Sequence, residues 1–411
     1  MSTSPKLNVA VVGASISDSP DGRERFSIRA HLPALKALSD QFEVVAACTT
    51  RMVSATATAR RFQLPHAFDN VERMLSELPD IDVVCVSVRP DTQHRVVMAA
   101  LKAGKHVYCE HPLGVTTTQA HEMWALAEAK GVRTAVGHQM HYEPAALQMA
   151  ELVRDGYIGR PLAFNITYLA SSYIAPRPNH RQWLFTAEAG GHPAYRTGHN
   201  LERLTSVLGL DITEVCADMA IMVPERPSLD GSAPLRNNQV DNINFLLRLG
   251  NVMGTLQVCL TAWHGPGWGF QVYGSEGMLM LGVQDRGAKN TVKGDPNSGE
   301  LRLFGARADI KELATNPTAP ELLQRKFQEI EPAKHQYRVS GIEHGRATFP
   351  VAQTWNAFAE AIRDGKPFAP SFREQLKMHY VWDATELSMR ERRWVKVEYG
   401  ELAPARSGAQ A

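Results

Sequence analysis

The chain has 411 residues, more than a single hydrophobic core usually holds, which favours two domains. Hydrophobic residues make up 44% and charged residues 21% of the sequence, as in an ordinary globular protein. A net charge of +1 excludes any general electrostatic attraction to nucleic acid or to an anionic membrane. No apolar run approaches the length of a membrane span and the start of the chain is polar, so we expect neither a membrane span nor a secretory signal, and a cytoplasmic location.

The five cysteines are far apart in the sequence, and no two of them form a Cys-x-x-Cys pair. Cys48, Cys85 and Cys109 each lie in an apolar run that is typical of a buried strand. We therefore expect reduced, buried side chains and no metal centre.

Residues 1–140 alternate short apolar segments with amphipathic ones. The apolar segments are hydrophobic on both faces, as in a buried parallel sheet. The predicted strands are Leu7–Val12, Glu43–Cys48, Val83–Val88, His106–Cys109 and Arg133–Val136. The predicted helices are Phe26–Leu38, Met52–Phe62, Val71–Leu78, Thr92–Ala103 and Thr118–Ala129. This order predicts an α/β domain with a doubly wound parallel sheet, in which ligands bind beyond the carboxyl ends of the strands.

The pattern changes after residue 140. A predicted helix, Pro144–Asp155, precedes segments in which apolar and polar residues alternate, as in a mostly antiparallel sheet with one exposed face. The predicted strands are Leu162–Ser171, Ile212–Val223, Asn242–Leu249, Val252–Leu260, Phe270–Tyr273 and Met278–Leu281. Residues 284–345 are expected to be irregular surface, followed by helices at Ala352–Arg363 and Arg373–Glu386. The sequence thus predicts a first domain over residues 1–140 and a second α/β domain over residues 141–411.

The first predicted strand ends in a turn that suits a dinucleotide. Gly13 lets the backbone approach a pyrophosphate at a helix N-terminus, and Ser15 follows in the same turn. The second strand ends in Thr50 and Arg51, where an acidic residue would hold the ribose of NAD. Hydroxyl groups and an arginine suit a 2′-phosphate, so NADP is slightly favoured over NAD.

A further contact with the cofactor is expected after the third strand. Arg89 and Pro90 lead into a predicted helix, and this arrangement would place His94 near the nicotinamide side of the cleft.

The segment Gly104–Pro112 reads Gly-Lys-His-Val-Tyr-Cys-Glu-His-Pro. It resembles the Gly-Lys-His-Val-x-x-Glu-Lys-Pro motif of the glucose–fructose oxidoreductase, inositol dehydrogenase and MocA family, with His111 in place of the lysine. A second motif of that family is matched in the same register by a glycine pair, a histidine, an acidic residue and a later glycine, and its aspartate is replaced by a tyrosine. These residues are Gly190, Gly191, His199, Glu202, Gly209 and, in place of the aspartate, Tyr195.

Other segments are most similar to the branch of that family that contains the fungal galactose-regulon repressor. They are Gly198-His199, Arg29–Leu35, Gly137–Gln139 and Gly156–Gly159. Because this branch contains both a regulator and apparent dehydrogenases, membership in it leaves catalysis open.

The resemblance implies a Rossmann domain that binds NAD or NADP and a second domain with a large, open-faced sheet for substrate binding and oligomerisation. It implies catalytic roles for His199, for His111 in place of the lysine, and for Tyr195 in place of the aspartate. Glu110 and Gln139 are expected at the cofactor. A small-molecule substrate and a homodimer or homotetramer are implied as partners.

Candidate substrate contacts lie mostly in predicted loops and at strand ends, and the resemblance adds His141, which stands where the family often carries an arginine. Aromatic faces and the forked donors of arginine suit sugars and also planar aromatic acids. These candidates are His141, Arg181, Trp183, Arg196 and Trp268.

We interpret the chain as an NAD(P)-dependent oxidoreductase acting on a sugar, polyol or related cyclic hydroxyl compound. One alternative is an enzyme with transient redox and elimination or hydrolysis, and no net redox. Another is a non-catalytic dinucleotide-binding sensor, which the loss of the motif lysine and aspartate favours. His111, Tyr195 and His199 argue for chemistry, since a site without a reaction does not need them.

Overall fold

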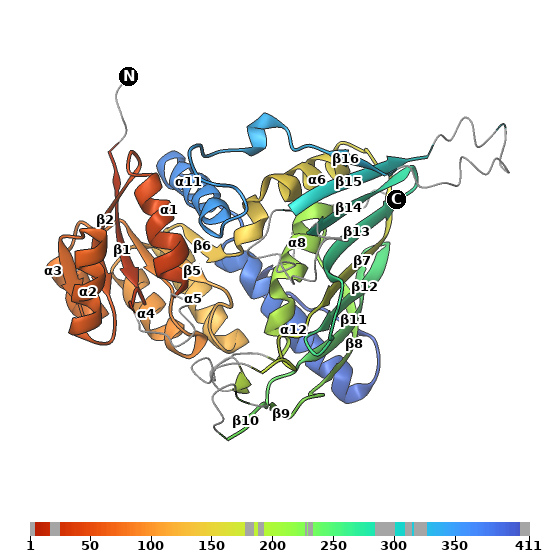
Figure 1. Cartoon of the computed structure of the whole chain (residues 1–411), viewed down its shortest axis with the longest axis horizontal. Helices are drawn as coiled ribbons and strands as arrows, with labels where there is room; N and C mark the ends of the chain where they lie inside the picture. Colours follow the sequence, from red (N-terminus) through yellow and green to blue (C-terminus); the bar gives the residue numbers. More distant parts are fainter. Residues whose placement is uncertain are drawn as a thin grey trace.

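The structure is a computed structural model that describes residues 5–16, 25–176, 185–187, 193–226, 228, 233–283, 301–308, 315 and 327–402. It contains a six-stranded sheet and a nine-stranded sheet, with helices between them (Figure 1). None of the described helices is both long enough and apolar enough to span a membrane.

The first sheet is parallel throughout, with the strand order β3-β2-β1-β4-β5-β6. Its strands are β1 (Leu7–Val12), β2 (Phe42–Cys48), β3 (His66–Phe68), β4 (Val83–Val86), β5 (His106–Glu110) and β6 (Thr134–Gly137). The flanking helices are η1 (Ser27–His31), α1 (Leu32–Ala37), α2 (Met52–Phe62), α3 (Val71–Glu77), α4 (Pro90–Lys102) and α5 (Thr117–Lys130). The predicted doubly wound sheet is confirmed. The strand order reverses beside β1, where such folds bind their ligands.

The strand β3 was not predicted. It has only three residues, and His66 at its start is exposed, so the sequence there lacks the apolar run that marks the other strands. It lies at the edge of the sheet, where one neighbour is enough.

The second sheet is mixed and mostly antiparallel, as predicted, and only β7 and β12 among its described pairs run parallel. Its strand order is β16-β15-β14-β13-β7-β12-β11-β8-β17. The strands are β7 (Pro161–Leu169), β8 (Glu214–Ala220), β11 (Asn242–Leu249), β12 (Val252–Cys259), β13 (Gly267–Gly274), β14 (Gly277–Val283), β15 (Leu301–Arg307), β16 (Gln328–Ile330) and β17 (Val395–Lys396). A separate two-stranded ribbon pairs β9 (Glu225–Arg226) with β10 (Leu235–Arg236).

The prediction of irregular structure over residues 284–345 was wrong in part, because β15 and β16 lie within this range. Leu301 and Leu303 are buried and alternate with Arg302, which is the pattern of a strand with one wet face. The glycine, proline and charged residues around them concealed these short segments.

Helices between the two sheets connect the domains (Figure 1). They are α6 (Pro144–Arg154), α8 (Gly198–Leu208) and α12 (Phe372–Glu391). The long helix α12 packs against β8 of the second sheet and against α5 of the first domain, while α11 (Thr348–Asp364) packs against α1. The C-terminal helices therefore return to the first domain and bring their side chains to the carboxyl edge of its sheet.

Candidate functional site

Three histidines from distant parts of the chain meet between the two sheets. His111 follows β5, His138 follows β6, and His199 lies in the first turn of α8. Their ring centroids are 4.7 Å apart for His111 and His138, 4.5 Å for His111 and His199, and 5.1 Å for His138 and His199. We call these three residues the histidine cluster. It lies at the carboxyl edge of the first sheet, where the fold places its ligands.

The sequence predicted His111 and His199 as site residues but did not single out His138. Its signal was its position directly after a buried strand, within the segment Gly137–Gln139. Among the described residues, no group of three or more metal-ligating side chains is arranged to hold an ion.

Gln375 in α12 joins two members of the cluster. Its amide oxygen Oε1 lies 2.9 Å from His111 Nδ1 and 2.8 Å from His138 Nε2, and its Nε2 is buried without a partner among the described residues. His138 Nδ1 lies 3.2 Å from His199 Nδ1, so a continuous hydrogen-bonded path links His111 to His199. Gln375 is fully buried, which fixes the amide between the rings.

The hydrogen positions along this path follow from one unambiguous partner. The backbone oxygen of Tyr195 can only accept, so His111 Nε2, at 3.1 Å, carries a hydrogen and donates it. Burial lowers the pKa of His111, which favours the neutral ring with a bare Nδ1. A neutral His111 therefore requires the Gln375 amide to be turned by 180° from the orientation in the structure, so that Nε2 faces both rings and donates to His111 and His138.

The same assignment determines which nitrogen carries the hydrogen in His138 and in His199. In the turned orientation His138 Nε2 accepts from Gln375, so the hydrogen of His138 lies on Nδ1 and is donated to His199 Nδ1. His199 then carries its hydrogen on Nε2. Burial, and the nearby positive charge of a protonated His111, lower the pKa of both His138 and His199 well below the usual range. With the Gln375 nitrogen toward the rings, all three rings of the cluster are neutral.

Gly198 leaves room for His111. A Cβ atom at position 198 would lie 2.2 Å from His111 Cε1 and 3.0 Å from Trp382 Cζ2. The Trp382 ring is buried and donates to Thr197 Oγ1 at 3.2 Å, so it is fixed. The histidine at 111 and the glycine directly before His199 therefore fit together.

An imidazole–carboxyl pair adjoins the cluster. His141 Nδ1 lies 2.5 Å from Glu202 Oε1, and Glu202 is almost completely buried. Burial disfavours the carboxylate, but the adjacent His141 outweighs this effect and lowers the pKa of Glu202. The predicted substrate residue His141 thus lies near the site, paired with Glu202.

Tyr195, a predicted catalytic residue, contributes its backbone oxygen to His111. Its own hydroxyl oxygen is buried and has no hydrogen-bond partner in the described part of the chain. Burial raises the pKa of Tyr195, so this hydroxyl remains a donor. The predicted substrate residue Arg196 stacks over the rings of Tyr195 and Tyr173, at 4.9 and 4.5 Å. Burial lowers the pKa of Arg196 to about 9.

Glu110 is held in place beside the cluster by two side chains. Gln139 Nε2 donates to Glu110 Oε2 at 2.9 Å. His31 Nδ1 accepts from Trp355 Nε1 at 3.1 Å, so its hydrogen lies on Nε2 and is donated to Glu110 Oε1 at 2.8 Å. His31 was not predicted as a site residue, because nothing in the sequence indicates that it reaches β5.

The expected cofactor residues at the ends of β1, β2 and β4 share the carboxyl edge of the sheet. Gly13 has a positive φ of 92°, and a Cβ there would lie 2.2 Å from Ser87 O. Ser15 follows in the same turn. Thr50 and Arg51 are exposed at the end of β2.

At the end of β4, Arg89 lies at the N-cap of α4 and its guanidinium is 3.4 Å from Asp91. Pro90 forms the first turn of that helix, so both residues stand at the same edge as Gly13.

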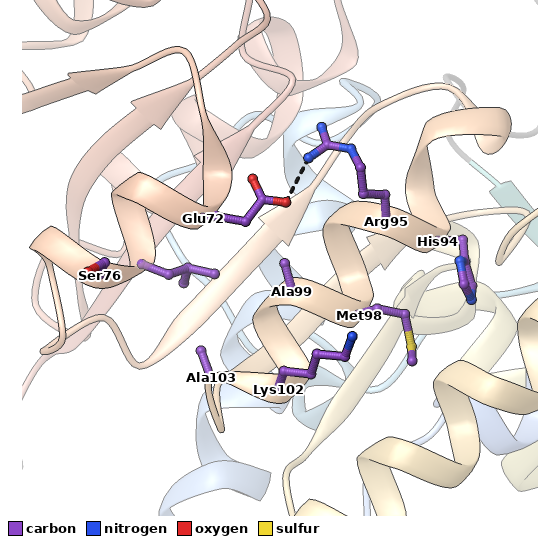
Figure 2. A pocket seen from close by; sticks show the side chains of 9 residues that line it. Glu72, Ser76, His94, Arg95, Met98, Ala99, Lys102 and Ala103 are labelled. Carbon is purple, nitrogen blue, oxygen red and sulfur yellow. Dashed lines mark hydrogen bonds and ion pairs between the residues drawn. The ribbon is translucent and has the colours of Figure 1, made fainter.

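The structure places His94 on the outer layer of helices. Its Nε2 lies 2.7 Å from Glu122 Oε2 of α5. It also lines an open groove of about 640 Å³ between α3 and α4, with Met98 and Lys102 (Figure 2). This placement argues against the expected contact of His94 with the nicotinamide. The sequence could not indicate which side of α4 carries this residue outward.

Of the remaining predicted substrate residues, one is described by the structure and two are not. Trp268 is buried at the start of β13 and donates from Nε1 to Asn200 Oδ1 at 2.8 Å, which makes it a packing residue beside α8. Arg181 and Trp183 lie outside the described residues, as do Gly190 and Gly191 of the second motif.

Comparison with known proteins identifies both halves of the chain. The profile of an oxidoreductase family with an NAD-binding Rossmann fold matches residues 7–138, and that of the GFO/IDH/MocA C-terminal domain matches residues 146–280. The 1,5-anhydro-D-fructose reductase of Ensifer adhaerens is 30% identical over 66% of this chain and 78% of the reductase. Levoglucosan dehydrogenase of Pseudarthrobacter phenanthrenivorans is 24% identical over 95% of this chain and 98% of the dehydrogenase.

Solved structures share the fold over nearly the whole chain. A levoglucosan dehydrogenase in complex with NADH and levoglucosan has a TM-score of 0.75 and 22% identity, and the match covers 96% of this chain and 100% of that one. A super-repressor mutant of Gal80p from Saccharomyces cerevisiae has a TM-score of 0.77 and 19% identity, covering 96% and 98%. One fold thus supports a dehydrogenase and a repressor, and the site must distinguish them.

Proposed function

Because this chain belongs to the GFO/IDH/MocA family of NAD-binding oxidoreductases, we propose that it is a dehydrogenase or reductase for a sugar, polyol or related cyclic hydroxyl compound. The family assignment confirms the resemblance drawn from Gly104–Pro112. The observation that carries the proposed reaction is the hydrogen-bonded path from His111 through Gln375 and His138 to His199.

The proposed cofactor site lies at the edge of the first sheet where β1, β2 and β4 end. Gly13 leaves the backbone bare where a pyrophosphate approaches, and a side chain there would collide with Ser87. We assign the ribose end to Thr50 and Arg51, which favours NADP over NAD because no carboxylate follows β2. When bound, the nicotinamide supplies the hydride acceptor or donor.

The orientation of the Gln375 amide decides what His199 offers to a substrate. With the nitrogen toward the rings, His199 presents an N–H group and binds a substrate oxygen. With the oxygen toward the rings, as in the structure, His111 must carry hydrogens on both nitrogens, since Gln375 and Tyr195 then both accept. His138 Nε2 donates in that state, its Nδ1 accepts from His199, and His199 Nε2 presents a lone pair.

Protonation of His111 therefore converts His199 into a base for the substrate hydroxyl. The positive charge on His111 also stabilises the developing alkoxide, which is the task of the lysine in the family motif. Tyr195 is proposed as an additional donor to the substrate oxygen, since its hydroxyl has no partner among the described residues.

The proposal is tested by a turnover screen of the purified protein. NAD⁺ and NADP⁺ are offered with sugars, polyols and cyclic diols, and reduced nicotinamide absorbance is recorded together with product masses. A product two mass units lighter, formed with rising absorbance, is the expected result. A changed substrate with flat absorbance would instead indicate elimination or hydrolysis without net redox.

His199→Ala should abolish turnover and leave the fold and dinucleotide binding intact, because His199 Nε2 is the group that exchanges the proton. Dinucleotide binding without any turnover by the wild-type protein would refute the enzymatic proposal.

A sensor is the second candidate, and two observations favour it. The Gal80p structure shares the fold over almost the whole chain, and His111 replaces the motif lysine. A sensor would bind a dinucleotide without turnover, and His199→Ala would leave binding of its protein partner nearly unchanged.

The two proposed roles, dinucleotide binding and substrate binding, are divided between the two sheets. We assign dinucleotide binding to residues 1–140, and substrate binding and oligomerisation to residues 141–411. The face of the second sheet opposite the buried Phe245 and Leu256 carries the exposed Leu246 and Met253. Burial of these side chains against a second copy would support a dimer or tetramer, which light scattering of the purified protein measures.

A further inference from the structure

Arg203 is a buried guanidinium beside the histidine cluster that the proposed proton path does not use. It lies four residues after His199 on α8, so both side chains share one side of the helix, one turn apart. Arg203 is only 2% exposed. A charged side chain that is buried this deeply requires an anion or several hydrogen-bond acceptors.

The plane of the guanidinium is fixed by an aromatic ring. The Arg203 Cζ atom lies 4.6 Å from the centre of the Trp268 ring. Trp268 is in turn fixed by the hydrogen bond from its Nε1 to Asn200. This stacking orients the N–H groups of Arg203 along one plane but accepts none of their hydrogens.

Two nitrogen atoms of the Arg203 guanidinium lack acceptors among the described residues. Nε and Nη1 are buried without a partner, and no carboxylate of the described residues lies within 4.0 Å of the guanidinium. Glu202 and Glu143 interact with the charge of Arg203 from beyond 4.0 Å. Glu202 Oε1 is paired with His141 and Glu143 Oε1 with His344. Burial lowers the pKa of Arg203 to about 10, so it still carries its charge at neutral pH.

We propose that Arg203 binds a carboxylate of the substrate, which makes the substrate a sugar acid or another cyclic hydroxycarboxylate. The planar fork of arginine matches the two oxygens of a carboxylate. Four residues of helix separate Arg203 from His199 by about 6 Å along the axis, a span that one sugar ring bridges. The inference deepens the proposed function and depends on it.

The test uses matched pairs of acids and neutral sugars with the dinucleotide-loaded protein. D-glucuronate is compared with D-glucose, and D-galacturonate with D-galactose, by kcat/KM and by calorimetric binding. The wild-type protein should favour the acid of at least one pair by tenfold or more. Arg203→Met should remove this preference, since methionine keeps the packing on Trp268 without a charge.

A matched control replaces another arginine that stacks on a tryptophan. Arg248 lies over Trp394 at 5.6 Å on the second sheet and is partly exposed. Arg248→Met should leave the preference for acids unchanged. Because Nε and Nη1 of Arg203 are buried without an acceptor among the described residues, Arg203→Met should not lower the melting temperature of the ligand-free protein. A marked fall would assign Arg203 a structural role and overturn the proposal.

The outcomes separate this inference from the proposed function. Turnover of neutral sugars without preference for any acid, or a preference that survives in Arg203→Met, overturns the carboxylate site and keeps the dehydrogenase. Absence of turnover with every compound refutes the dehydrogenase, whereas acid binding that is lost in Arg203→Met still supports the site. If no acid binds, ordered water satisfies Arg203 and the inference fails.

Discussion

Replacing Gly198 by alanine tests the fit between α8 and His111 directly. The added Cβ would lie 2.2 Å from His111 Cε1, 2.6 Å from His111 Nε2 and 3.0 Å from Trp382 Cζ2. Carbon atoms in contact are normally at least about 3.5 Å apart, so one partner must move by about 1 Å. The buried Trp382 is fixed by its hydrogen bond to Thr197, and His111 is therefore the residue that moves.

The expected cost follows from these contacts. Overpacking of a buried site costs about 1–3 kcal/mol, and the lost hydrogen bond from His111 Nε2 to Tyr195 O adds about 1 kcal/mol. The higher helix propensity of alanine offsets up to about 1 kcal/mol of this loss in stability. We expect Gly198→Ala to lower the free energy of unfolding by about 1–3 kcal/mol. A displacement of about 1 Å at a catalytic group should reduce turnover by about 100-fold.

Thermal denaturation followed by circular dichroism and kcat/KM on the substrate found by screening measure the two effects. Gly282→Ala is the matched control, because an added Cβ there meets no atom within 4 Å. Its melting temperature and turnover should stay close to those of the wild type. Wild-type stability and turnover in Gly198→Ala would refute the close packing of His111 against α8.

Two further predictions address protonation and cofactor choice. Alcohol oxidation should lose kcat/KM as the pH rises through the pKa of His111, which burial holds below its usual value, since His199 is a base only while His111 is protonated. Gln375→Glu places a carboxylate beside His111 and should raise this pKa, so the pH profile of kcat/KM should shift upward; an unshifted profile would contradict the coupling. Arg51→Glu should change the preference from NADP to NAD by at least tenfold in KM, because it repels a 2′-phosphate and offers an acceptor to a ribose hydroxyl. An equal loss of affinity for NADP and NAD would instead show that Arg51 only caps α2.

The sequence by itself determined most of the fold and two of the three histidines of the cluster. The short apolar strands with valine on both faces fixed the parallel sheet, because only a doubly covered sheet buries such segments. Gly13 marked the turn at the cofactor end, since a side chain there would collide with Ser87. His111 and His199 were found because each stands in a local motif of the family.

Tertiary structure alone decided which polar side chains complete the site. Gln375 and His111 are 264 residues apart, and Gln375 lies among buried apolar residues of α12 without a local signal. His138 and His31 are likewise joined to the site by packing between elements. Arg203 would be an ordinary charged residue in a sequence, and only its burial against Trp268, with Nε and Nη1 unpaired among the described residues, led to the proposed carboxylate site. Local patterns specify which segments become helices and strands, whereas contacts between distant segments decide which of their polar groups are buried and paired.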